Sequence, residues 1–256
     1  MINLDASKIK DNAAELRYKL GLDDQNPLDI FSVIADSQDI TLVFYPLNKN
    51  FSGLCMRNNT SKFVVVNSNH SEGRQRFTAA HELCHLFYHE AFPKIICSLR
   101  PEKTDLIERE ADMFASYFII PNMSLKRFFK ERLGKEFCIA LNNNDLVRIE
   151  QHFKMSRMAV LYRLAEYERC ITWTKANQLK NGVKSHAASL GYDTALYEPT
   201  PEDKKYFSLG KYVRVVEEAK SKEKLTESKY ESLLLDGFRS DIVYNLNEDS
   251  DEEFYD

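Results

Sequence analysis

The sequence lacks the cysteine spacing of a zinc site or a disulfide scaffold. Its five cysteines are an odd number, lie far apart in a chain of 256 residues and form no CxxC pair. A disulfide framework and a cysteine-type zinc site are therefore both disfavoured, and we expect reduced thiols. The cysteines are Cys55, Cys84, Cys97, Cys138 and Cys170.

Long apolar runs are also missing. The longest apolar stretch near the middle of the chain, MFASYFII, is far too short to cross a bilayer. The N-terminal segment MINLDASKIKDNAAELRYKLGL is a candidate amphipathic helix and lacks the apolar run of a signal peptide. We therefore expect a cytoplasmic protein without a membrane partner.

The chain has little excess charge of either sign. Its net charge is −4, and the segment 247–256 holds six acidic groups and no basic ones, so the rest of the chain carries about +2. A nearly neutral body gives no general reason to expect nucleic-acid binding. We expect the acidic tail to be a solvated, disordered end.

The order of elements predicts an α+β fold, with helices before and after a small antiparallel sheet. Helical patterns come first, β-branched segments follow, and helical patterns return after them. The expected domains are a main domain at 1–173, which carries the motifs that follow, an irregular linker at 174–205, a small helical region at 206–246 and the acidic tail at 247–256.

The stretch FTAAHELCHLFYHE contains an HExxH pattern on a predicted helix. His81 and His85 are four residues apart, so their imidazoles point toward one locus on the helix surface. Two neutral imidazoles suit zinc, and Glu82 beside them suits a general base. His89 lies about 12 Å along the helix from His81, which excludes it as a third ligand to the same ion. It is left as a surface residue or a partner of a ligand.

A third ligand has to come from another segment, and TDLIEREADMFASYF offers Glu108 and Glu110. We favour Glu108 because its helical neighbours are mostly small or apolar, which permits close packing. Asp112, one turn on, is then placed to accept a hydrogen bond from a ligand histidine. Glu110 would have Phe114 at that position, which offers no such contact.

Three protein ligands leave a fourth position open, as in a catalytic Zn²⁺ site. Such an ion activates water and polarises a carbonyl, and Glu82 can transfer the proton of that water to a leaving amine. The motif therefore predicts hydrolysis of a peptide bond. Cys84 neighbours the ligand face and could compete for zinc, but we interpret it as a small buried hydrophobe.

RQRFTAAHELCHLFYH followed by EREADMFASYFIIP resembles the ImmA/IrrE family of metallopeptidases, over about residues 10–170. The resemblance implies a zincin-like domain with zinc at His81, His85 and Glu108, and Glu82 as the base. It also implies a protein substrate, a DNA-binding repressor whose cleavage releases stress or mobile-element genes. Two departures stand out: Cys84 occupies a position where many members have Gly or Ala, and no repressor-type domain precedes residue 30.

The segment 144–170 has the rhythm of a helix-turn-helix, with Ser156 as an N-cap. Arg157 and Arg163 could then contact phosphates. The alternative, favoured by the resemblance, is that this helix pair packs on the catalytic domain. The competing functional hypothesis is therefore a DNA- or protein-binding regulator whose metal site is structural or vestigial. The sequence does not give the oligomeric state.

Overall fold

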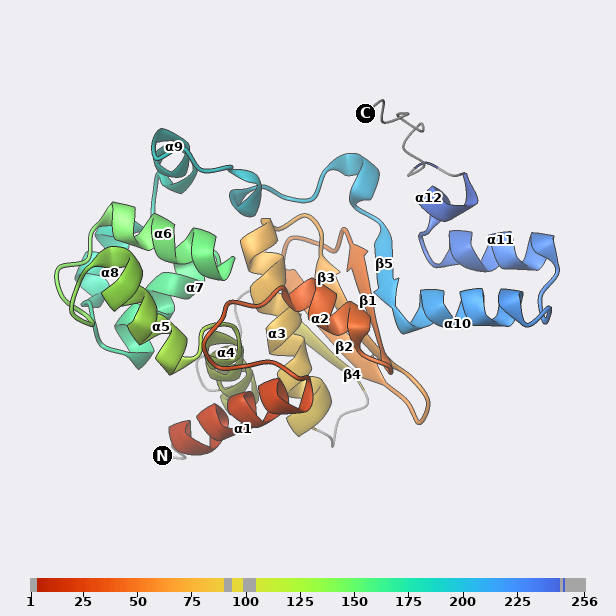
Figure 1. Cartoon of the computed structure of the whole chain (residues 1–256), viewed down its shortest axis with the longest axis horizontal. Coiled ribbons are helices and arrows are strands. Elements are labelled where there is room, and N and C mark those ends of the chain that lie inside the picture. The colour runs from red at the N-terminus through yellow and green to blue at the C-terminus, as the bar shows by residue number, and fades with distance from the viewer. Residues whose placement is uncertain (1–3, 90–93, 99–104, 245, 247–256) are drawn as a thin grey trace, which may run out of the picture.

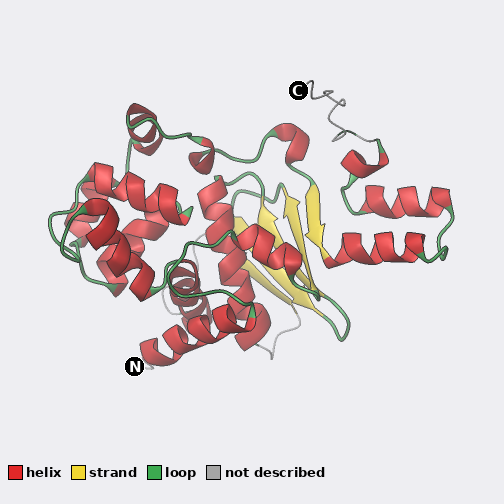
Figure 2. Ribbon diagram, viewed as in Figure 1, coloured by secondary structure: helices red, strands yellow, loops and turns green. Residues whose placement is uncertain are grey.

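The computed structural model describes residues 4–89, 94–98, 105–244 and 246. The acidic tail expected at 247–256 lies outside the described residues. Within the described part, helices surround a single sheet, so the α+β expectation is confirmed (Figures 1 and 2).

The sheet described has five strands in the order β4-β2-β3-β1-β5. β1 runs parallel to β3, while the other neighbouring pairs are antiparallel. The expectation of a wholly antiparallel sheet is therefore wrong at this pair, because β2 lies between β1 and β3 in the sequence and the two strands run in the same direction. The strands are β1 (Ile40–Tyr45), β2 (Phe51–Arg57), β3 (Lys62–Asn67), β4 (Lys94–Ser98) and β5 (Phe207–Gly210).

Twelve α-helices, two π-helical segments and two short 3-10 segments make up the rest of the regular structure among the described residues. Figure 1 shows α5 to α9 at one end of the long axis and α10 to α12 at the other. The helices are α1 (Ala6–Lys19), α2 (Ile30–Asp36), α3 (Glu72–Tyr88), α4 (Leu106–Ile119), α5 (Asn122–Phe128), α6 (Asn143–Phe153), α7 (Arg157–Tyr162), α8 (Trp173–Leu179), α9 (Val183–Ser189), α10 (Lys211–Ser221), α11 (Glu227–Asp236) and α12 (Ser240–Val243).

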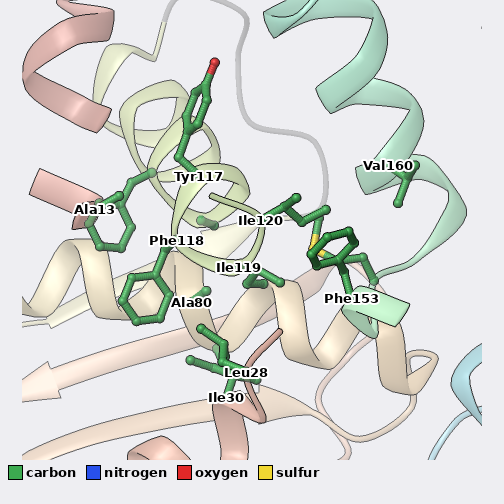
Figure 3. Close-up of a cluster of buried hydrophobic side chains, with 14 of the residues drawn as sticks. Ala13, Leu28, Ile30, Ala80, Tyr117, Phe118, Ile119, Ile120, Phe153 and Val160 are labelled. Carbon is green, nitrogen blue, oxygen red and sulfur yellow. The ribbon is translucent and has the colours of Figure 1, made fainter. Parts of the chain in front are cut away.

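Helix α3 is the central element because it packs on strands β2 and β3 and also on α4. Small side chains on α3, such as Ala79 and Ala80, are fully buried and allow this close approach. On the other side, α1 packs on α4, and Figure 3 shows Ala13, Ala80 and Phe118 in the shared core. The two helices that carry the candidate metal ligands are thus held by apolar contacts on several sides.

The predicted helix pair at 144–170 is present as α6 and α7, and Ser156 caps α7 through a hydrogen bond from the Ala159 amide. The two arginines that could have contacted phosphates are buried, which agrees with the favoured alternative that this helix pair packs on the rest of the chain. Arg157 forms an ion pair with Glu150, and Arg163 donates to the Ser116 carbonyl at 2.8 Å. These guanidinium groups stabilise the interior, and a DNA backbone has no access to them.

The expectation of reduced thiols is wrong for one pair, because Cys138 and Cys170 form a disulfide. Thirty-two residues separate them in sequence, with two helices between, so spacing alone gave no sign of the pairing. Cys55, Cys84 and Cys97 are free and buried.

The region after residue 173 is more regular than its sequence indicated. The segment 174–205 contains α9 and most of α8, and 207–210 adds β5 to the edge of the sheet beside β1. The division of the chain into domains stays a prediction. Among the described residues, the helices are too short or too polar to serve as a membrane span.

Candidate metal centre

Two buried histidines face each other on α3. The Nε2 atoms of His81 and His85 are 3.0 Å apart, and both side chains are almost fully covered. Their four-residue spacing brings them together on one helical face, as the sequence indicated. Two nitrogen atoms at this separation, aimed at the same point, are suited to share one metal ion.

Helix α4 brings a carboxylate to the same point. Glu108 Oε2 lies 3.4 Å from His81 Nε2, and Glu108 Oε1 lies 3.4 Å from His85 Nε2. The helix begins at Leu106, and Glu108 lies in its first turn. Asp105 is the N-cap and accepts hydrogen bonds from the Ile107 and Glu108 amides. Burial alone would raise the pKa of Glu108, but hydrogen bonds from both imidazoles hold it well below its usual range.

The outer nitrogens of both histidines also have partners. His81 Nδ1 lies 2.9 Å from Asp112 Oδ1. Burial acts to lower the pKa of His81, but its contacts with Asp112 and Glu108 outweigh this effect and raise the pKa to about 10. Carboxylate partners of this kind fix the tautomer and the orientation of a metal-binding imidazole. The structure therefore places Asp112 where the sequence argument required it.

His89 contacts a ligand histidine and lies outside the donor cluster. Its Nδ1 atom is 2.7 Å from His85 Nδ1, and its Nε2 atom is 3.6 Å from Glu110 Oε2. Glu110, the rival candidate for third ligand, is thus directed at His89. Each candidate ligand histidine thus has its own polar contacts. Asp112 contacts His81, and His89, which faces Glu110, contacts His85.

A fourth donor was missed from the sequence. Cys97 on β4 lies with His81, His85 and Glu108 in a buried set whose ligand atoms are all within 4.8 Å of one another. The thiol is 3.8 Å from Glu108 Oε1. The absence of a CxxC pair disfavours a cysteine-type zinc site, but a single cysteine from a separate strand needs no such pair. The letters KIICS show no polar–apolar alternation that would single out Cys97, so its burial next to the exposed Ile96 is seen only in the structure.

Glu82 is completely buried beside this donor set. Neither of its carboxylate oxygens has a hydrogen-bond partner of standard geometry among the described residues. Burial raises the pKa of Glu82 to about 7, although His81 and the nearby Cys97 and Cys55 thiols act in the opposite direction. A buried carboxylate without partners is costly unless a water or an ion is normally present beside it.

Strand β2 comes unusually close to this carboxylate at Gly53. A Cβ atom built there would lie 3.0 Å from Glu82 Oε1, 2.6 Å from Thr78 Cγ2 and 2.6 Å from the Val65 carbonyl oxygen. Glycine is therefore required by space at this position. The absence of a side chain lets the sheet pack against the face of α3 that carries Glu82.

A cavity of about 500 Å³ opens onto the site. His81, Glu108 and Asp112 line it on one side, and Met158, Tyr162 and Lys184 from the α7 to α9 region line it on the other. The two histidines, the carboxylate and the thiol fit a divalent metal ion, since each can offer one nitrogen, oxygen or sulfur atom to the same point. The unpartnered Glu82 carboxylate is consistent with such an occupant.

A helix bearing HExxH, a carboxylate from the next helix and a mixed sheet behind them define a zincin-like metallopeptidase domain. The chain belongs to the peptidase M78 family, because the model of the IrrE N-terminal-like domain matches residues 35–165. It is also similar to the uncharacterized protein YqaB of Bacillus subtilis (strain 168), with 23% identity over 158 residues. That match covers 61% of this chain and 86% of YqaB. The family confirms the predicted resemblance and supports a metallopeptidase-type function.

Proposed function

We propose that the protein is a zinc-dependent endopeptidase that hydrolyses a peptide bond in a protein substrate. The observation that carries the proposal is the buried, unpartnered carboxylate of Glu82 beside the His81, His85 and Glu108 donor set. A purely structural metal site has no use for a base in this position. The choice of zinc rests on the two imidazoles and the carboxylate, the ligand set of many catalytic zinc sites.

The residues divide the work as follows. His81, His85 and Glu108 hold the ion, and Asp112 orients His81 through its Nδ1 atom. Zinc, when bound, supplies a Lewis acid that activates water and polarises the substrate carbonyl. Glu82 takes a proton from the attacking water and delivers it to the leaving amine. The buried position of Glu82 strengthens its electrostatic interactions with these groups.

The substrate would approach through the cavity beside His81 and Glu108. Its lining includes the exposed side chains of Met158 and Tyr162, together with Lys184, which forms an ion pair with Glu198. Such a surface suits an extended peptide segment with apolar side chains. We propose a transcriptional repressor, or a similar regulator of stress or mobile-element genes, as the substrate. The family resemblance supports a repressor as the substrate, and we expect the reaction to take place in the cytoplasm.

A second candidate is a DNA- or protein-binding regulator with a structural metal site. Cys97 favours it, because four protein ligands are typical of closed, structural zinc sites. The burial of Arg157 and Arg163 removes the phosphate contacts on which its DNA-binding form depended. Glu82 favours the enzyme, so we retain peptide hydrolysis as the primary proposal.

The direct test is to co-express the protein with a repressor encoded beside its gene and to measure the intact mass of the repressor. We expect two fragments whose masses sum to that of the substrate plus one water. Purified components should repeat the cleavage, lose it on chelation and regain it with added zinc. Cleavage that survives complete metal removal would contradict the proposal.

A further inference from the structure

We propose that Cys97 is a reversible fourth protein ligand, and that its thiolate closes the metal centre by occupying the position that the catalytic water would use. This inference rests on the proposed metal site of His81, His85 and Glu108. It adds a latent state to that site and assigns a chemical role to a residue of strand β4.

The separations within the cluster match one small coordination sphere. The three distances among the His81, His85 and Glu108 donors are 3.0, 3.4 and 3.4 Å, and the Cys97 sulfur lies 3.8 Å from Glu108 Oε1. Zinc–nitrogen and zinc–oxygen bonds of about 2.0 Å and a zinc–sulfur bond of about 2.3 Å give tetrahedral edges of roughly 3.3 to 3.5 Å. The ligand atoms of all four residues lie within 4.8 Å of one another, so shifts of about 1 Å would complete a four-ligand site.

The fold directs the Cys97 side chain toward this point. On β4, Ile96 is 51% exposed whereas Cys97 is 1% exposed, which is the alternation of a strand with one buried face. Cys97 pairs with Gly53 of β2, and the Ser52 hydroxyl donates to the Cys97 carbonyl at 3.2 Å. The thiol is therefore positioned by the sheet, independently of the two helices that carry the other donors.

Cys97 also competes with the proposed chemistry. Its thiol is close to Glu82, the base that has to reach a water molecule at the metal. Four protein ligands close a zinc site, whereas three leave a position for water or substrate. With sulfur bound, Glu82 has no water to activate. When the sulfur leaves, it takes up one proton and a water molecule takes its place, so the same residues form an open site.

Among the other free cysteines, Cys84 gives a matched control. It is as buried as Cys97 and lies on α3 between the two histidines, yet it is outside the four-residue donor set. Replacing either cysteine with alanine removes a thiol of equal size from the interior. Only the Cys97 variant removes a donor.

The test uses the full-length protein loaded with Co²⁺ in buffer free of added thiols. Wild type and Cys84→Ala should show sulfur-to-cobalt charge-transfer absorption in the near ultraviolet, and Cys97→Ala should lack it. Azide is the probe for an open coordination position. It should bind Cys97→Ala about tenfold more tightly than wild type, because a wild-type site that is open about one-tenth of the time loses that factor in apparent affinity. Equal azide affinity in wild type and Cys97→Ala would show that the Cys97 thiolate does not close the site.

The outcomes separate this inference from the proposed function. If Co²⁺ binds to wild type without sulfur absorption, the metal centre stands and the role of Cys97 fails. If no Co²⁺ binds, the metal centre itself fails. X-ray absorption of the zinc-loaded wild type needs no variant: we expect one sulfur neighbour at about 2.3 Å. A shell of nitrogen and oxygen alone would overturn the inference even if Cys97→Ala does not fold.

Discussion

Replacing Asp112 with asparagine should weaken zinc binding without unfolding the protein. Asp112 accepts a hydrogen bond from His81 Nδ1 at 2.9 Å. It therefore orients the candidate ligand His81 without binding the metal itself. Loss of such a partner costs 10- to 100-fold in metal affinity. Because the Asp112 side chain is 37% exposed, solvent screens part of its charge, and we expect the lower end. That loss, about tenfold, corresponds to about 1.4 kcal/mol.

The assay is competition for zinc between the protein and a chromophoric chelator, with unfolding followed in parallel. Glu110→Gln is the matched control. Glu110 contacts His89 at 3.6 Å and reaches the candidate ligand His85 only through His89, whereas Asp112 contacts His81 directly. We expect its effect on zinc affinity to stay within about twofold, as for a weak, partly exposed contact. Unchanged affinity in Asp112→Asn, or a larger loss in Glu110→Gln, would refute the reasoning.

Three further substitutions test the third candidate ligand, the close approach of β2 to α3 and a buried ion pair. Glu108→Gln should reduce the bound zinc measured by atomic emission well below one per chain, while Glu110→Gln should keep it; equal metal content would remove Glu108 as a ligand. Gly53→Ala should lower the free energy of unfolding in urea by about 1 to 3 kcal/mol, because its Cβ would overlap the Val65 carbonyl oxygen; an unchanged midpoint would contradict that close approach. Glu150→Gln should cost about 3 kcal/mol in the same assay, because it leaves the buried Arg157 charge without its partner, and a loss below about 1 kcal/mol would count against this pair.

The sequence was most informative where one helix carried the information. His81, Glu82 and His85 lie on a single helical face, and the four-residue period alone brings the histidines together. Glu108 could be chosen over Glu110 because close packing of α4 required small neighbours, and the structure brings Glu108 to the histidines. Their roles in binding and catalysis stay predictions.

The elements missed were those that depend on contacts between distant segments. Cys97 belongs to a short strand, and its place beside the histidines comes from the pairing of β4 with β2. The Cys138–Cys170 disulfide likewise joins residues that are remote in sequence. Arg157 and Arg163 looked available because charged residues are mostly exposed, but each has buried oxygen partners supplied by other elements. Local periodicity contains none of this information.

The measurement that tests the central claim most directly compares wild type with Glu82→Gln. Zinc content and repressor cleavage should be measured on the same samples, by atomic emission and intact mass. We expect equal zinc in both proteins and cleavage at least about a hundredfold slower in Glu82→Gln, since the variant keeps the donors and loses the base. Equal zinc with an unchanged cleavage rate would contradict the assignment of Glu82 and the peptidase mechanism built on it.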